Sequence, residues 1–99
     1  MSTPPWGVDI RELDASTHDG RRHIAIGAFV HTGRWWQPIG IVRMVGIGIG
    51  RAELAVEVVD AWHGRGVGTA LLRAARERAT TLGYSELVAE VHSGSPAAA

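Results

Sequence analysis

The chain has 99 residues, of which 45% are hydrophobic and 20% charged, and its formal net charge is zero. This length allows one small domain, and the apolar content excludes general disorder. The balanced charge gives no general attraction to nucleic acid or to an anionic membrane. The sequence has no cysteine, which excludes disulfides, thiolate zinc sites and a cysteine nucleophile. The five histidines lack the close pairing of a helix-borne metal site, so we expect no metal.

The N-terminal segment carries no targeting signal and predicts little regular structure. Its first residues, MSTPPWGVDI, lack the charged start and apolar stretch of a signal peptide. No apolar run in the chain approaches the roughly 18 residues that span a bilayer. We therefore expect a cytoplasmic protein. Residues 1–20 are expected to be irregular, although Val8–Leu13 alternates weakly enough for a short strand.

Three segments predict strands, the first and the last of them by period-two alternation. They are His23–His31, Ile39–Val45 and Arg51–Val59. The turn Thr32–Arg34 and the bulky connection Trp35–Pro38 join the first two, which predicts an antiparallel pair. The glycine-alternating run Gly46–Gly50 precedes another strand rather than a helix, so we interpret it as a hairpin connection.

Trp35 and Trp36 carry much apolar area in a connection between strands. We interpret them as a cover for the open edge of a small core. The alternative is a surface that contacts an acceptor or a partner.

Gly68–Leu82 predicts the one helix of the chain. Its apolar stripe at helical spacing comprises Leu71, Leu72, Ala75, Ala79 and Leu82. Gly83 follows as a left-handed cap, and Ser85–His92 predicts a last strand. A helix that crosses between two strands of one sheet makes them parallel. The sequence therefore predicts an α/β (α+β) fold with a mixed, partly antiparallel sheet and one crossover helix.

Three glycines stand at alternate positions between the strand Arg51–Val59 and this helix. Gly64, Gly66 and Gly68 let the backbone approach a ligand closely, because no Cβ stands in the way. The loop aims unpaired N–H groups at one point, where a helix N-terminus adds roughly half a positive charge. This layout predicts a phosphate-binding site.

The segment Ala52–Leu72 resembles the core of the GNAT superfamily of N-acyltransferases. The family signature, Gln/Arg-x-x-Gly-x-Gly/Ala, falls on His63, Gly66 and Gly68. The preceding strand ends at Val58-Val59-Asp60, where the family has a Val-x-Pro-like step, and the resemblance extends over roughly residues 22–95. It implies an acyl-CoA N-acyltransferase core, incomplete at both ends, with an irregular segment over 1–20, a partial domain over 21–95 and a tail over 96–99.

The resemblance also implies acetyl-CoA as the co-substrate. Its expected contacts are Val56, Val58, His63, Gly64, Arg65, Gly66, Val67, Gly68 and Thr69. Backbone amides of residues 64–69 would hold the pyrophosphate, and Arg65 would add a charge-assisted contact. The pantetheine arm would lie against the strand edge at Val56–Val58. The Val58 amide would stabilise charge on the thioester oxygen.

A protonated amine must lose a proton before it can attack a thioester. Glu53 and Glu57 are candidate bases, because alternation places both on the face of Ala55. The resemblance favours Glu53. The alternative for either residue is a solvated carboxylate on a half-exposed sheet.

The sequence departs from the family pattern at several positions. His63 replaces the usual Gln or Arg with a donor whose charge depends on pH. Ser95 stands roughly where many members carry Asn. The helix and hairpin that follow the last strand in the family are missing, and with them the Tyr that protonates the leaving thiolate. Tyr84 precedes the last strand, so we expect it in the core or at its rim.

These patterns leave two classes of function open. The first is an N-acetyltransferase in which a small-molecule or protein amine attacks acetyl-CoA directly in a ternary complex. The second is a truncated module that binds CoA or a partner protein without turnover. A dinucleotide-binding loop is disfavoured because Leu71 stands where its third glycine should be. An exposed edge at the last strand also predicts pairing with a second copy of the chain.

Overall fold

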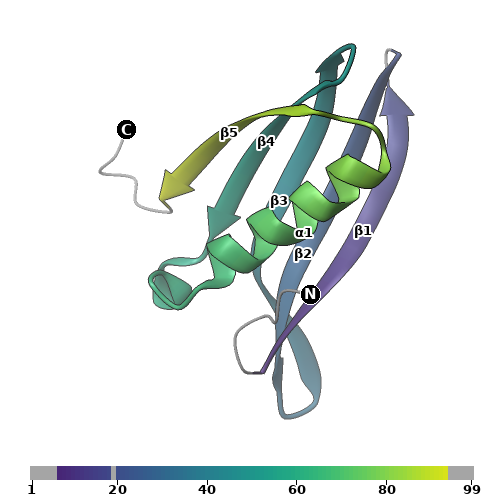
Figure 1. Ribbon diagram of the computed structural model, residues 1–99. Coiled ribbons are helices and arrows are strands. Elements are labelled where there is room, and N and C mark those ends of the chain that lie inside the picture. Colours follow the sequence, from purple (N-terminus) through teal and green to yellow (C-terminus); the bar gives the residue numbers. More distant parts are fainter. Residues whose placement is uncertain (1–6, 19, 94–99) are drawn as a thin grey trace.

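The computed structural model describes residues 7–18 and 20–93 and shows a mixed sheet with one helix on one face (Figure 1). The elements are β1 (Val8–His18), β2 (Arg21–Thr32), β3 (Trp35–Gly48), β4 (Arg51–Val58), the 3-10 turn η1 (Asp60–Trp62), α1 (Val67–Thr81) and β5 (Glu86–Ser93). The strands lie side by side in chain order, with antiparallel pairs from β1 to β4 and a parallel β4–β5 pair. The predicted α+β class and topology are confirmed.

Some predictions fall outside the described residues. They are the irregular start at Thr3–Pro5, Ser95 in the place of the family Asn, and the tail over 96–99. The predicted bounds of α1 and β5 differ from the observed ones by one residue at each end.

β1 corrects the expectation of an irregular N-terminal segment. The strand runs from Val8 to His18 and pairs with β2 along its whole length. Its register shifts between Glu12 and Asp14, which makes Leu13 a bulge residue. A bulge shifts the inward-facing phase of a strand by one residue, so the alternation seen in sequence breaks down there. The pairing partner, not the local pattern, makes this segment a strand.

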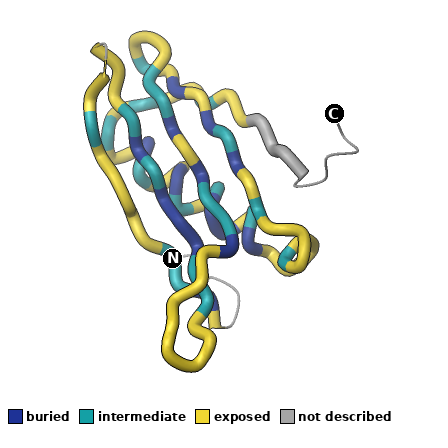
Figure 2. The backbone as a smooth tube through the Cα atoms, turned by 180° about the vertical axis from the view of Figure 1, so that it is seen from behind, coloured by how far each residue is buried: buried dark blue, intermediate teal, exposed yellow. Residues whose placement is uncertain are grey.

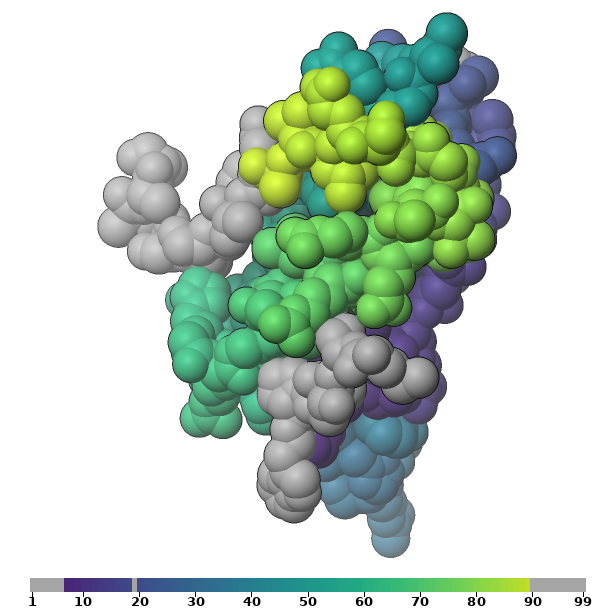
Figure 3. Space-filling model, in the orientation of Figure 1, coloured from purple at the N-terminus to yellow at the C-terminus, as the bar shows by residue number. Residues whose placement is uncertain are grey.

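The expectation for the two tryptophans is also wrong. Trp35 and Trp36 belong to β3 and are 73% and 46% exposed. The tip of the β2–β3 hairpin extends beyond the end of α1 (Figures 1 and 3), so no core lies beneath it to be covered. Trp36 instead contacts the ring of His31 and the guanidinium of Arg11.

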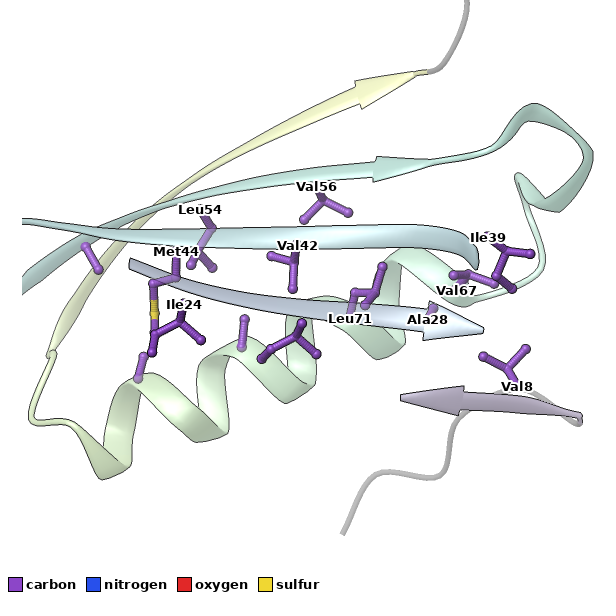
Figure 4. Close-up of a cluster of buried hydrophobic side chains, with 14 residues drawn as sticks. Val8, Ile24, Ala28, Ile39, Val42, Met44, Leu54, Val56, Val67 and Leu71 are labelled. Carbon is purple, nitrogen blue, oxygen red and sulfur yellow. The ribbon is translucent and has the colours of Figure 1, made fainter. Parts of the chain in front are cut away.

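The hydrophobic core lies between α1 and the sheet (Figure 4). The helix contributes Leu71 and the small residues Ala75 and Ala79, which let it approach the strands closely. The strands contribute alternate residues, including Ile24, Ile26, Val42, Met44, Leu54 and Val56. The opposite face of the sheet carries no helix from the described part of the chain (Figure 2), and we call it the open face. In the described residues, no helix is both long enough and apolar enough to cross a bilayer.

The end of α1 follows the predicted left-handed cap. Gly83 has φ of +90°, and Tyr84 N–H donates to the carbonyl of Ala79 at 2.9 Å. This geometry closes the helix and turns the chain back along β4. Tyr84 packs against the core at its rim, as expected.

Substitution of Leu71 tests the packing of the helix on the sheet. Its side chain is completely buried, so we expect Leu71→Ala to lower the free energy of unfolding by about 2–5 kcal/mol. Ile49→Ala is the control, because Ile49 is fully exposed in a turn and should change stability by less than about 0.5 kcal/mol. Urea unfolding measures both, and equal effects would contradict this packing.

Candidate functional site

The chain between β4 and α1 makes two tight turns in succession. Val59 N–H donates to the carbonyl of Ile39 at 2.9 Å, which keeps the chain on the sheet one residue beyond β4. Trp62 N–H then donates to Val59 and His63 N–H to Asp60, at 2.9 and 3.1 Å. Gly64 and Gly66 follow with φ of +72° and +84°. Residues with a Cβ rarely adopt these angles, so both glycines are required by the path of the backbone.

In the described part of the chain, six consecutive amides of this loop make no short, well-aligned backbone hydrogen bond. The first helical hydrogen bond runs from Ala70 N–H to the carbonyl of Gly66 at 3.0 Å. Within residues 7–18 and 20–93, none of the N–H groups of residues 64–69 makes a short, well-aligned hydrogen bond to a backbone carbonyl, and no side chain caps the helix. The first turn of α1 also carries no acidic residue. Free donors at the positive end of a helix dipole bind an anion.

Gly68 differs from the other two glycines of the loop. Its backbone is not left-handed, and a Cβ built there would lie 3.8 Å from Val58 Cγ2, an ordinary contact. The fold therefore accepts a side chain at this position. Glycine at residue 68 leaves this space free between the first turn of α1 and the end of β4.

The side chains around the loop are held by contacts within it. The guanidinium carbon of Arg65 lies 4.7 Å from the centre of the Trp62 ring, a cation–π distance. Val67 is buried in the core, so it offers only its backbone to a ligand. Thr69 is exposed on the first turn of α1.

His63 ties the loop to the end of β4. Its Nε2–H donates to the carbonyl of Val58 at 2.7 Å, and the same nitrogen lies 3.9 Å from a carboxylate oxygen of Asp60. The side chain is 37% exposed. The Val58 carbonyl can only accept, so the hydrogen must be on Nε2. His63 thus holds the strand end rather than projecting freely toward a ligand.

Both edges of β4 are paired in this structure. Val58 lies opposite Gly40 of β3 and opposite Ser93 of β5. The amide of Val59 points to β3, so the amide of Val58 points to β5, because successive N–H groups alternate sides along a strand. Val56 is buried and offers only its backbone. A pantetheine arm can reach this edge only where the end of β5 separates from β4.

A groove of about 620 Å³ lies at the same end of the sheet. Its lining residues are Leu13, Phe29, Pro38, Gly40, Ile41, Glu57, Val58, Val59 and Asp60, and we call it the open-face groove. Glu57 lies opposite Ile41 on β3 and lines it. Glu53 is exposed on the same strand but does not line the groove. The two glutamates are four positions apart, or about 13 Å along a strand.

Sequence reasoning missed the apolar part of this groove. Leu13, Phe29 and Ile41 come from three strands, and only the sheet brings them together. Gly27 is the one residue whose type could have indicated this groove from the sequence. A Cβ there would lie 2.8 Å from Leu13 Cδ1 and 2.9 Å from Phe29 Cε1, so its absence lets these side chains converge. A glycine inside a strand marks such a close approach.

Comparison with known proteins identifies the family. A family model described as acetyltransferase (GNAT) family matches residues 3–99. Comparisons with curated proteins and with solved structures found no match. The match covers nearly the whole chain, including the sheet, the glycine loop and the helix that follows it. The chain belongs to the GNAT acetyltransferase family.

Proposed function

We propose that this protein is an N-acetyltransferase that uses acetyl-CoA to acetylate an amine. The observation that carries the proposal is the run of amides over residues 64–69 at the start of α1, which make no short, well-aligned backbone hydrogen bond in the described residues. The pyrophosphate of CoA is an anion that fits such donors. Arg65 adds a positive charge beside them, held over the Trp62 ring.

The end of β4 supplies the donor for the reacting carbonyl. With the pyrophosphate at the glycine loop, the thioester would reach the β5 side of Val58, where the Val58 amide points. That N–H would stabilise the negative charge that develops on the thioester oxygen. The His63 contact holds the neighbouring carbonyl in place, so the strand end keeps its orientation.

Glu57 is the base that the open-face groove favours. It is one residue from Val58 and lines the groove, whereas Glu53 lies about 13 Å away along the strand. The amine nitrogen would bond to the thioester carbon as the carbon–sulfur bond breaks. Glu57 would accept the amine proton, directly or through water, and the sulfur would leave as the thiolate and become protonated.

One observation favours the second candidate, a domain that binds CoA without turnover. β5 pairs with β4 as far as Val58 and Ser93, so the edge that the thioester needs is occupied. Turnover then requires this end of β5 to open. Binding of the pyrophosphate at the glycine loop does not require β5 to open.

Thiol release and thermal unfolding separate the two candidates. Acetyl-CoA at about 100 times its Kd should stabilise the fold by about 2.7 kcal/mol and raise the Tm by about 10 °C or more. An acetyltransferase will also release CoA when an amine is added. A stabilised protein that releases none over a broad amine panel is the binding module. A Tm that acetyl-CoA leaves unchanged contradicts both candidate functions.

Gly68→Ala tests the anion site. We expect it to leave the Tm of the free protein unchanged or slightly higher, because the fold has room for the methyl group and alanine favours helix. We expect CoA affinity, measured by calorimetry, to fall about tenfold or more, because the methyl group stands where the phosphate approaches. Gly48→Ala is the control, since nothing lies within 4 Å of its Cβ and it is far along β3. Unchanged affinity in Gly68→Ala would remove the basis of the proposal.

Glu57→Gln and Glu53→Gln form a matched pair for the base. Both remove one charge from the same strand and the same face. We expect Glu57→Gln to lower kcat by about 10²–10⁴-fold with acetyl-CoA affinity unchanged, and Glu53→Gln to have little effect. The reverse result would assign the base to Glu53, as the family resemblance favours.

A further inference from the structure

We infer that the acceptor is a primary amine with a single positive charge on an apolar body, such as an arylalkylamine, and that it binds in the open-face groove. This inference rests on the proposed acetyltransferase function and names its substrate class. The groove, at about 620 Å³, has a volume typical of small-molecule sites, about 300–1,000 Å³. Its two ends differ in chemistry, and the difference orients the ligand.

One end of the groove is negatively charged. Glu57 and Asp60 line it where β4 gives way to the glycine loop. In the described part of the chain, no Lys or Arg pairs with either carboxylate, and Asp60 has only His63 at 3.9 Å. Asp60 is 67% exposed, so this carboxylate is open to solvent and to a ligand. An ammonium group complements this end, and it lies there beside the amide of Val58.

The middle and far end of the groove are apolar. Ile41 lies directly opposite Glu57, and Phe29 and Leu13 continue the surface onto β2 and β1. Leu13 is 50% exposed, so its side chain is accessible to a ligand in the groove. From β4 to β1 the sheet spans three strand spacings, or about 14 Å, which accommodates a ring on a short alkyl chain.

The far end disfavours a second positive charge. The guanidinium carbon of Arg11 lies 5.8 Å from the centre of the Phe29 ring and 4.6 Å from that of Trp36. Arg11 pairs with Asp9, so its charge is partly compensated, but it still stands beside the apolar wall. A polyamine that extends along the groove would bring its second ammonium toward this guanidinium. A monocation with an apolar body avoids that repulsion.

The test compares acetyl transfer from acetyl-CoA to four probes by thiol release. They are phenethylamine, ethanolamine, spermidine and a peptide with one lysine among polar residues. We expect kcat/KM for phenethylamine to exceed each of the others by about tenfold or more, because only its ring fills the apolar part of the groove, where one buried methylene already gives about 10-fold discrimination. A preference for ethanolamine, spermidine or the peptide overturns the inference but leaves the transferase function intact.

Variants locate the preference in the groove. Ile41→Thr should lower the phenethylamine-to-ethanolamine ratio of kcat/KM about fivefold or more, because it removes apolar contact beside Glu57. Ile47→Thr is the matched control, on the same strand but outside this groove, and should leave the ratio unchanged. Leu13→Thr tests the far wall at an exposed position if Ile41→Thr fails to fold. An unchanged ratio in the folded groove variants overturns the inference.

Failure of the proposed function gives a different result. No transfer to any of the four amines, with the Tm still raised by acetyl-CoA, indicates a binding module and overturns the inference as well. No effect of acetyl-CoA on the Tm overturns the proposed function at its first step.

Discussion

The left-handed backbone at Gly64 and Gly66 is the constraint on which the rest of the site depends. These two residues reverse the chain within a few positions of the end of β4, so α1 begins directly beside the strand that precedes it. The amides of residues 64–69, the Val58 amide and the Glu57 carboxylate therefore share one end of the sheet. A longer or differently turned connection would separate the anion site from the strand end.

The single helix divides the sheet into two faces with different roles. On one face, α1 buries the apolar residues of four strands and provides the stability of the domain. On the other face nothing in the described residues covers the sheet (Figure 2), and apolar side chains from β1, β2 and β3 line the groove at the end where β4 stops. The same alternation that sends Leu54 and Val56 to the core sends Glu53 and Glu57 to the open face. Folding and the proposed chemistry thus use opposite sides of the same strand.

His63 and β5 both contact the end of β4. The imidazole of His63 donates a hydrogen bond to the Val58 carbonyl. β5 pairs with the edge of β4 at Val58 that the thioester would need. Of these two contacts, only the second would have to change in the proposed reaction. The cost of opening the last residue pairs of an edge strand is small compared with that of opening a central one, because an edge strand is held on one side alone. The exposed edge of β5 stays a predicted surface for pairing with a second copy.

Local patterns in the sequence determined much of this protein. Period-two alternation located β2 and β4, and helical spacing located α1. The glycines marked the loop between β4 and α1. Each of these signals acts over a few neighbouring residues. Only the tertiary structure decided that Val8–His18 is a strand, that Trp35 and Trp36 are exposed, and that Glu57 rather than Glu53 lines a groove. These facts depend on strand register, on a bulge at Leu13 and on where the hairpin passes the helix end. Such contacts join residues that are distant in the chain, and a local pattern carries no information about them.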